Sequence, residues 1–510
     1  MKTLNVSRKV LVTGVCAVAV AGAALVYGPD LFDDGPEPLP GPAGRAMTAV
    51  TAGAPAALPD LVALIGDRRT WLREHPGDEA SWAVLGAAYT ERGTRFAEAE
   101  DFPRAERALR KSLAVLPAKR GNVDAQLGLA ALANARGDFA RGRAWGERVR
   151  KEAPKRWAAY PVLIDAYKGL GDYQAAQKAM TALEGLHSGA AVLDRAAQMY
   201  RDRGWREDAG AAALEAAAYA GSPVQKAACL HRLGELAWER GEPAEAVAQY
   251  TAALRLAPAH GPALAGRARA LGALGRTAEA FRDYRAALAA TPLPEYALEA
   301  GELYEAEGLD GDAATQFETL RARATEAGAQ GVNGELTLAR FETDHGEPDE
   351  GVRRLKAEWA RGHRSMEVAD ALAWALYRTG EAEEALPYAK RVTDEGRRSA
   401  LFAYHRGEIE RTLGEYGAAR RHIGEALRIN PYFSPLLAPK AKEALAALGD
   451  PPEGGPKDME DARRAREAAA AAEAARAAEA ARAANAAKAV TPAKPAKPAP
   501  ARKPGGAARP

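Results

Sequence analysis

The stretch GEPAEAVAQYTAALRLAP, residues 241–258, decides the fold because variants of it recur along the chain. Residues 275–292 read GRTAEAFRDYRAALAATP, and residues 414–431 read GEYGAARRHIGEALRINP. Each stretch begins with glycine, has small residues at its sixth and thirteenth places and a large residue at its tenth, and ends with proline. Self-similarity of this kind indicates a repeat architecture, in which each unit packs on its neighbours.

Glycine marks the same place in a long series of units. The glycines are Gly137, Gly171, Gly204, Gly241, Gly275, Gly308, Gly346, Gly380 and Gly414. The spacing between neighbouring members of this series is nearly constant. An earlier unit around Trp82, Leu85 and Tyr89 follows the same pattern. The sequence therefore predicts ten repeats over residues 79–431.

This period and pattern resemble the tetratricopeptide repeat (TPR) family, whose unit is about 34 residues long. The resemblance implies an all-α fold in which about ten helix hairpins stack into a right-handed superhelical solenoid. It also implies a concave groove lined by the first helix of each hairpin. The composition agrees, because aromatic residues are only 6% of the chain while alanine, leucine, glutamate and arginine, which favour helix, are abundant.

One position of the second helix is small in every repeat, which allows two helices to approach closely. The ten residues are Ala105, Gly142, Ala176, Ala209, Ala246, Ala280, Ala313, Gly351, Ala385 and Ala419. The leading glycine permits a positive φ after the first helix, and a closing proline ends the second helix in several repeats. These features predict two helices of about 13 residues per repeat, near the usual helix length.

A capping helix is predicted on each side of the repeats, and a linker is predicted before the first cap. Residues 61–78 and 432–449 are expected to form capping helices, since the ends of a solenoid need a polar outer face. Residues 29–60 are rich in proline and glycine and are predicted to be an extended linker.

The C-terminal part of the chain changes composition twice. Residues 450–458 are a Pro/Gly-rich linker, and residues 459–488 are an Ala/Glu/Arg-rich stretch that predicts a single helix supported by local ion pairs. Residues 489–510 contain Lys, Arg, Pro and Ala without acids, which predicts a basic disordered tail. This tail is a candidate contact for anionic wall polymer or lipid, whereas nucleic acid is disfavoured because aromatic residues are lacking.

Residues 1–28 have the pattern of a targeting segment. Lys2, Arg8 and Lys9 precede an apolar run, 10–27, which is just long enough to span a bilayer. Positive charge before the run and acids after it predict a signal anchor with the body on the extracytoplasmic side of the cell membrane. The alternative is a signal peptide that is cleaved, so that the protein is secreted.

The sequence offers little for catalysis. Phosphate loops, dinucleotide fingerprints, nucleophile elbows and zinc-protease motifs are lacking, and two cysteines exclude a disulfide framework. His405 and Glu408 are one helical turn apart, and we interpret them as a polar helix face rather than as metal ligands. Cys229 lies near His231 in the sequence, and we interpret it as a buried apolar residue rather than as a nucleophile. No catalytic residue, cofactor or metal is predicted, and the chain is not expected to be an enzyme.

The TPR resemblance places candidate partner-binding residues at positions 2, 5, 9 and 12 of the first helices. They are Asp194, Gln198, His231, Glu235, Trp238, Arg269, Glu302, Arg340, Trp374, Tyr377, Tyr404, Glu408 and Arg411. Trp238 and Trp374 have the alternative of packing between repeats. Some TPR proteins grip a C-terminal carboxylate with paired Lys and Asn, but Ala83 and Leu127 are among the residues at those positions, so this mode is not supported.

The predicted function is a non-catalytic protein–protein interaction scaffold of the cell envelope that binds a partner segment in its groove and aids assembly of a larger complex. The alternative is a wall- or membrane-associated structural protein that acts through its basic tail. An enzyme with a site assembled across repeats is a remote third possibility. The identity of the protein or peptide partner and the oligomeric state are left open.

Overall fold

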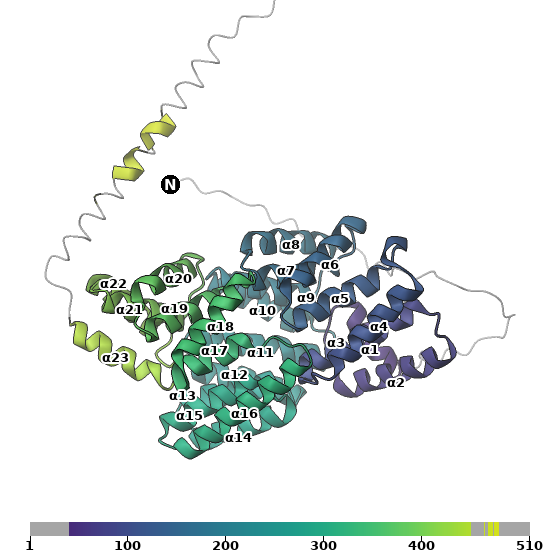
Figure 1. Ribbon diagram of the computed structural model, residues 1–510, viewed down its shortest axis with the longest axis horizontal. Helices are drawn as coiled ribbons and strands as arrows, with labels where there is room; N and C mark the ends of the chain where they lie inside the picture. The colour runs from purple at the N-terminus through teal and green to yellow at the C-terminus, as the bar shows by residue number, and fades with distance from the viewer. Residues whose placement is uncertain (1–39, 450–463, 465–467, 473, 479–510) are drawn as a thin grey trace, which may run out of the picture. The chain divides into compact units, whose positions relative to one another are not determined.

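The computed structural model describes residues 40–449, 464, 468–472 and 474–478. Contacts divide the chain after Gly41, and the second unit, Pro42–Pro510, contains the helical array coloured from purple to yellow-green in Figure 1. The described residues form helices and no strand. The predicted all-α fold is therefore confirmed.

Ten hairpins, named here repeats 1 to 10, follow one another in the described part of the chain. The first helices are α3 (Glu79–Phe96), α5 (Val123–Ala135), α7 (Ala159–Gly169), α9 (Ala190–Asp202), α11 (Pro223–Glu239), α13 (Gly261–Ala273), α15 (Pro294–Ala306), α17 (Glu335–His345), α19 (Met366–Arg378) and α21 (Ala400–Thr412). The second helices are α4 (Asp101–Val115), α6 (Phe139–Glu152), α8 (Tyr173–Leu186), α10 (Arg206–Tyr219), α12 (Pro243–Leu256), α14 (Thr277–Ala290), α16 (Asp310–Ala329), α18 (Pro348–Ala360), α20 (Ala382–Asp394) and α22 (Tyr416–Ile429).

Four further elements lie outside the hairpins: α1 (Pro42–Thr51), α2 (Leu58–Glu74), the short 3₁₀ helix η1 (Ala118–Arg120) and α23 (Leu437–Leu448). The helices expected within residues 61–78 and 432–449 are thus present. The predicted linker 29–60 differs, because α1 forms inside it and packs on α2. Ala46 is fully buried in one apolar cluster with Leu61 and Leu64, and this burial gives a stretch with little periodicity a fixed place.

Three predicted segments fall outside the described residues, namely the apolar run 10–27, the linker 450–458 and the tail 489–510. Among the helices that are described, none is long and apolar enough to cross a membrane. The described residues within 459–488 are helical.

Small residues allow the hairpins to interlock, as the repeat pattern predicts. Tyr250 of α12 is fully buried, and its ring lies against Gly234 of α11 and Gly266 of α13, where a side chain would overlap it. The leading glycines end the first helices in the left-handed conformation, with φ of 76° at Gly241. Gly346 is the exception in this series, with φ of −135°.

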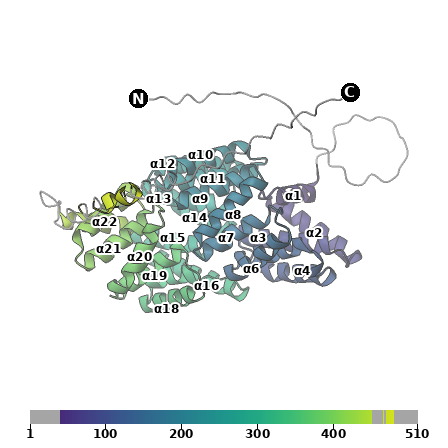
Figure 2. The same ribbon diagram turned by 90° about the horizontal axis from the view of Figure 1, so that it is seen from above.

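The leading glycines of repeats 2 to 5 contact loops that lie much later in the chain. A side chain at Gly137 would meet Asn333, and those at Gly171, Gly204 and Gly241 would meet Arg364, Gly396 and Pro431 respectively. Hydrogen bonds join the same regions: Asn333 N–H donates to Arg136 O (2.9 Å), Met366 N–H to Tyr173 Oη (2.8 Å), and Asn430 Nδ2 to Trp238 O (2.8 Å). Repeats 2–5 are therefore packed against the loops before repeats 8–10 and the cap. Figure 2 shows the same array of helices from above.

Candidate binding cavity

A cavity of about 560 Å³ lies within the second half of the array. Its walls are residues of the first helices of repeats 5 to 10, namely α11, α13, α15, α17, α19 and α21, with Tyr284 of α14. The segment 431–442, which leads into α23, completes the lining. The cavity is therefore on the surface where the repeat pattern placed the groove.

Acidic and aromatic side chains dominate this lining. The acids are Glu295, Glu299, Glu302, Glu307, Asp344 and Asp370, and the aromatic residues are Trp238, Tyr284, Trp374, Tyr432 and Phe433. The basic residues are Arg269, Arg340 and Lys442, with His405 beside them. Six carboxylates against three permanent cations give the cavity a negative potential, which favours a basic group.

Five of the thirteen predicted groove residues line this cavity: Trp238, Arg269, Glu302, Arg340 and Trp374. The remaining eight lie elsewhere on the first helices or under the lining. Trp374 is only 6% exposed, because its ring stacks on His405 and Tyr377 and its Nε1 donates to Asp344 at 3.0 Å. For Trp238 and Trp374 the sequence left two alternatives, packing between repeats or facing the groove. Both side chains are buried between repeats, and both also form part of the cavity wall.

Near Trp374, four predicted residues form a separate cluster. Glu408 is buried and accepts hydrogen bonds from Arg411 Nη2 at 2.7 Å and from Tyr377 Oη at 3.4 Å. Tyr404 is buried beside them in the core that α23 caps. The polar groups of Glu408, Arg411 and Tyr377 bond to one another, so in this part of the groove the charges are already paired within the protein.

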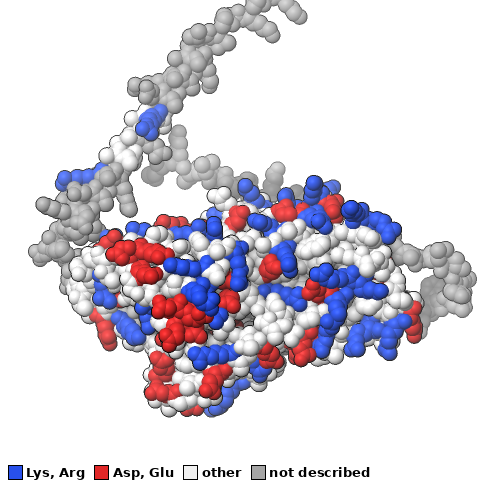
Figure 3. Space-filling model, viewed as in Figure 1, with Lys and Arg blue, Asp and Glu red and all other residues white. Residues whose placement is uncertain are grey.

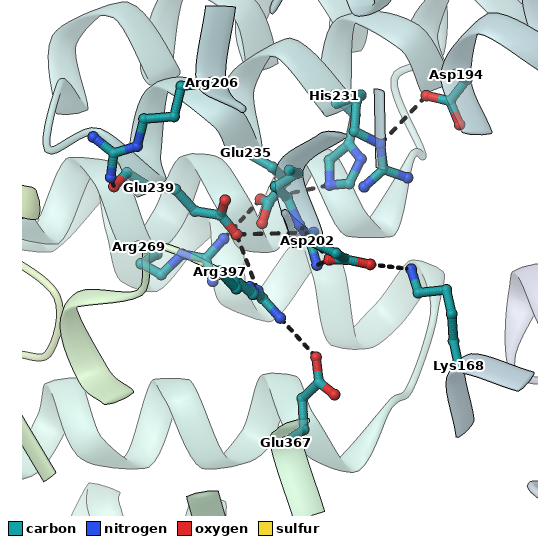
Figure 4. Close-up of polar contacts among 12 residues, drawn as sticks. Lys168, Asp194, Asp202, Arg206, His231, Glu235, Glu239, Arg269, Glu367 and Arg397 are labelled. Carbon is teal, nitrogen blue, oxygen red and sulfur yellow. Dashed lines mark hydrogen bonds and ion pairs between the residues drawn. The ribbon is translucent and has the colours of Figure 1, made fainter. Parts of the chain in front are cut away.

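A buried ion network takes up the middle of the first helices (Figure 4). Glu235 accepts from Arg269 Nη2 at 2.7 Å and from Tyr250 Oη at 2.5 Å, and His231 Nε2 lies 3.6 Å from it. Burial works against ionisation, yet Arg269 and His231 lower the pKa of Glu235 to about 2. These residues are therefore already paired within the protein.

Arg269 connects this ion network to the cavity. Its Nη1 lies 3.5 Å from Glu299, and its guanidinium stands over the Trp238 ring, 5.2 Å from the centroid. Burial raises the pKa of Glu299 despite Arg269, so this carboxyl holds a proton more tightly than an exposed one. The cation at the inner end of the cavity is thus held by two acids and a tryptophan.

At the start of this surface, Asp194 and Gln198 are satisfied locally. Asp194 lies 3.3 Å from Arg232 Nε of the next repeat, and Gln198 Nε2 donates to Asp194 at 3.1 Å. The structure therefore separates the predicted residues into paired networks and an open cavity.

The sequence reasoning missed five acids of the cavity, including Glu307 just after α15, and the segment 431–442. Glu295 and Asp370 occupy the second and fifth positions of their first helices, so the rule that selected the other candidates would also have found them. Glu299 and Asp344 are one residue away from such positions. The segment 431–442 carries no groove signal, because it follows the last repeat.

The candidate metal and nucleophile residues have structural partners. His405 Nδ1 pairs with Asp370 at 3.0 Å, and Glu408 points to Arg411 instead of His405. Burial raises the pKa of the Cys229 thiol to about 12, which keeps it protonated at neutral pH. In the described residues, no group of three or more His, Cys, Asp and Glu side chains is arranged to hold a metal ion.

Two half-buried histidines predict a loss of stability in mild acid. Burial lowers the pKa of His231 to about 3 and that of His260 to about 4, from 6.5. As the pH falls, each histidine is protonated in the unfolded chain before it is protonated in the folded protein. The stability that each contributes is therefore complete above pH 6.5 and decreases at lower pH. Each should cost about 1.5 kcal/mol of unfolding free energy between pH 6.5 and pH 5. Glu235, with its pKa near 2, stays ionised over this window.

Urea unfolding of the parent and of His231→Gln at pH 6.5 and pH 5 checks this expectation. The variant should lose about half of the pH dependence in this window, and His260→Gln should remove most of the other half. Burial opposes protonation of His345, but Glu302 and Glu305 raise its pKa. Protonated His345 therefore stabilises the folded protein, and this stabilisation is complete below pH 6.5 and is lost as the pH rises. If the pH dependence of stability is the same in His231→Gln and the parent, His231 binds its proton as readily in the folded protein as in the unfolded chain.

The fold and the cavity define a solenoid of helix hairpins with an inner binding surface. The tetratricopeptide repeat family matches this chain at residues 90–156, 231–293 and 371–432, which contain hairpins of the early, middle and late parts of the array. The chain is a tetratricopeptide repeat protein, and its fold is that of a protein–protein interaction scaffold.

Solved structures that align with this chain include a tetratricopeptide repeat protein from Parabacteroides merdae, at 22% identity over 51% of this chain and 99% of that one, with a TM-score of 0.32. The APC/C hetero-tetramer Cut9–Hcn1 aligns at 14% identity over 73% of this chain and 64% of its own, with a TM-score of 0.37. PilF of Pseudomonas aeruginosa aligns at 18% identity over 41% of this chain and 97% of its own, with a TM-score of 0.33. A comparison with curated proteins gave no match.

Proposed function

We propose that this protein is a non-catalytic scaffold of the cell envelope that binds a segment of a protein partner in its inner cavity. The observation that carries the proposal is the 560 Å³ cavity on the first helices of repeats 5–10, with acids and aromatic rings in its walls. This volume is typical of sites that take a ligand group, about 300–1,000 Å³. The partner segment should therefore insert a basic side chain next to an apolar or aromatic one.

Charge and burial support this chemistry. Glu307 at the edge of the cavity is exposed and has no ion pair among the described residues, so it is available to a ligand. Trp374 and Trp238 are buried side chains, held by ring stacking and by the Arg269 guanidinium respectively, and each contributes a small apolar part of the cavity wall. Aromatic anchors beside a charge are the usual centre of a protein interface.

The location outside the cytoplasm is proposed on the sequence of residues 1–28, where three cations precede an apolar run. The body would be held at the cell membrane by this anchor, or released if the segment is cleaved. Protease treatment of spheroplasts tests this part separately, since digestion of the body without lysis is expected. Protection of the body until lysis would contradict an extracytoplasmic location and leave the cavity proposal standing.

The cavity is tested by photo-crosslinking in intact cells, with a photoreactive amino acid at Arg340. We expect discrete crosslinked proteins that disappear when Glu302→Arg and Glu307→Arg are combined, since two reversed charges repel a basic segment. Glu215→Arg with Glu318→Arg, at exposed sites on α10 and α16, is the matched control and should keep them. A synthetic peptide from the crosslinked protein should bind the purified parent about tenfold more tightly than the cavity variant.

A crosslinking pattern that persists in the cavity variant, or a peptide that binds both variants equally, would exclude this cavity as the binding site.

A further inference from the structure

A second groove, which we call the basic groove, lies at the opposite end of the array, between α2 and α4 and over α3. It encloses about 800 Å³. Its lining is Gly66, Arg69, Thr70, Leu72, Arg73, Trp82, Leu85, Tyr89, Arg104, Arg107, Ala108 and Lys111. This groove is distinct from the inner cavity and shares no residue with it.

Five cations and no acid line the basic groove. Arg69 and Arg73 are one turn apart on α2, while Arg104, Arg107 and Lys111 follow one face of α4. Figure 3 shows Lys and Arg gathered over this end of the array. Two rows of positive charge therefore face each other across α3.

Four of these cations are available to a ligand. Arg69, Arg73, Arg107 and Lys111 are exposed and have no ion pair among the described residues, although Arg73 donates a hydrogen bond to the Thr70 hydroxyl at 3.0 Å. Arg104 differs, because it pairs with Asp101 at 2.9 Å and with Glu100 at 3.0 Å. An array of unpaired like charges costs free energy through mutual repulsion, and a negatively charged partner would remove that cost.

Apolar side chains form the floor between the two rows. Leu72 of α2, Leu85 and Tyr89 of α3 and Ala108 of α4 lie there. Trp82 is fixed beside them, since its Nε1 donates to Pro76 O at 3.0 Å. A charged rim around an apolar floor matches an amphipathic helix, whose apolar stripe lies in the groove while its flanks meet the rim.

We propose that the basic groove binds an acidic amphipathic helix of a protein partner. Its apolar residues, at i, i+3, i+4 and i+7, lie on Leu72, Leu85 and Ala108, and Asp or Glu on both flanks pair with Arg69 of α2 and with Arg107 of α4. A nucleic acid or another polyanion is the weaker fit, because it would use the two rows of charge and leave the apolar floor empty. Binding is salt-dependent but not abolished by salt, since the floor contributes an apolar part.

The test uses three fluorescein-labelled probes and the full chain. The first is a peptide of about five helical turns with leucine at helical i, i+3, i+4 and i+7 positions and glutamate on its flanks. The second has the same composition with the leucines at alternate positions, and the third is polyglutamate of equal length. Fluorescence anisotropy is expected to show binding of the first peptide at least about tenfold tighter than of the other two, because only it matches the floor and the rim together.

Variants locate the interaction. The double variant Arg69→Glu with Arg107→Glu should weaken binding of the first peptide by about tenfold or more, since the reversed charges repel the glutamates on its flanks. Arg143→Glu with Arg285→Glu changes the net charge equally at exposed sites on α6 and α14, and affinity should stay within about twofold. The cavity variant with Glu302→Arg and Glu307→Arg should also bind normally, so failure here and failure of the inner cavity are separable.

Three results would overturn the proposal: equal binding of all three probes, binding of a single-stranded oligonucleotide more tightly than of the helical peptide, or no effect of Arg69→Glu with Arg107→Glu. The first two would identify the groove as a general polyanion site, and the third would place the peptide elsewhere. Failure of all probes to bind would show that the apolar floor is not accessible to a helix.

Discussion

Gly171→Ala is expected to weaken the contact between early and late repeats, whereas Gly275→Ala is not. Both glycines end a first helix with almost the same backbone, φ of 72° and 73°. A methyl group at Gly171 would overlap the carbonyl oxygen of Arg364, while one at Gly275 would meet nothing within 4 Å. The pair therefore separates the cost of the left-handed backbone from the cost of the contact across the array.

The left-handed conformation should cost about 1–2 kcal/mol in both variants. In Gly171→Ala the loop before α19 must also move, and this overpacking should cost a further amount of about 2 kcal/mol. The displacement would loosen the bond from Met366 N–H to Tyr173 Oη, which lies at the same contact. Gly204→Ala, facing Gly396 O, should behave like Gly171→Ala, and Gly308→Ala like Gly275→Ala.

Urea unfolding and small-angle X-ray scattering measure the two effects. Gly171→Ala and Gly204→Ala should unfold at lower urea and have a larger radius of gyration, while both controls keep the radius of the parent. Equal losses of stability in all four variants, with unchanged scattering, would show that the contact between the early and late repeats contributes nothing to stability in solution.

Local features of the fold could be predicted well from the sequence because they depend on neighbours in the chain. The small residue at Ala246, the large one at Tyr250 and the glycine at Gly241 each contact the adjacent helix or end it. Every such contact recurs with the period of the repeat, so the pattern carries it. This is why the number of hairpins and the capping helix before residue 449 were predictable.

The contacts between repeats 2–5 and the late loops carry no such signal. Gly171 and Gly275 occupy the same place in the repeat, yet only Gly171 meets another part of the chain. That difference depends on how tightly the solenoid winds, which is the sum of many small rotations between neighbouring hairpins. A period in the sequence does not fix this sum, so the long-range contacts become visible only in the structure.

The candidate site was half predictable for the same reason. First-helix positions pointed to Glu302, Arg340 and Trp374, which line the cavity wall. They gave equal weight to Glu235, whose charge is paired internally with Arg269, and to His231, whose ring lies 3.6 Å from Glu235. Helical position identifies the surface that a side chain faces, but not whether another buried side chain already occupies it.

Arg397→Ala should destabilise the protein by about 2 kcal/mol, because Arg397, in the loop between repeats 9 and 10, joins this part of the array to the distant repeat 5 through partly buried ion pairs. Its Nη1 lies 2.6 Å from Glu367 of α19, and its Nη2 lies 3.2 Å from Glu239 of α11 (Figure 4). Arg201 connects Glu239 at 3.8 Å to Asp202, whose side chain is 6% exposed. Removing one partner of a fully buried ion pair costs about 3–5 kcal/mol, and the carboxylates here are partly exposed, which reduces the value.

The pH dependence distinguishes this ion network from simple packing. Burial opposes ionisation of Glu367, but Arg397 lowers its pKa, so the stability that this carboxylate contributes is present above its unfolded value of about 4.5 and is lost as the pH falls. The difference in unfolding free energy between Arg397→Ala and the parent should therefore decrease from pH 7 to pH 3. Arg421→Ala, at an exposed site on α22, is the control and should change stability by less than about 0.5 kcal/mol.

Combining Arg397→Ala with Gly171→Ala tests whether these two sites stabilise one shared contact. Both lie between the early and late repeats, so a chain already opened by Gly171→Ala has less of the Arg397 interaction to lose. The double variant should then be more stable than the sum of the single losses predicts, by an interaction energy of about 1 kcal/mol. Strict additivity would mean that the glycine contact and the ion network act independently, and that the late repeats can separate from the early ones at one site while staying docked at the other.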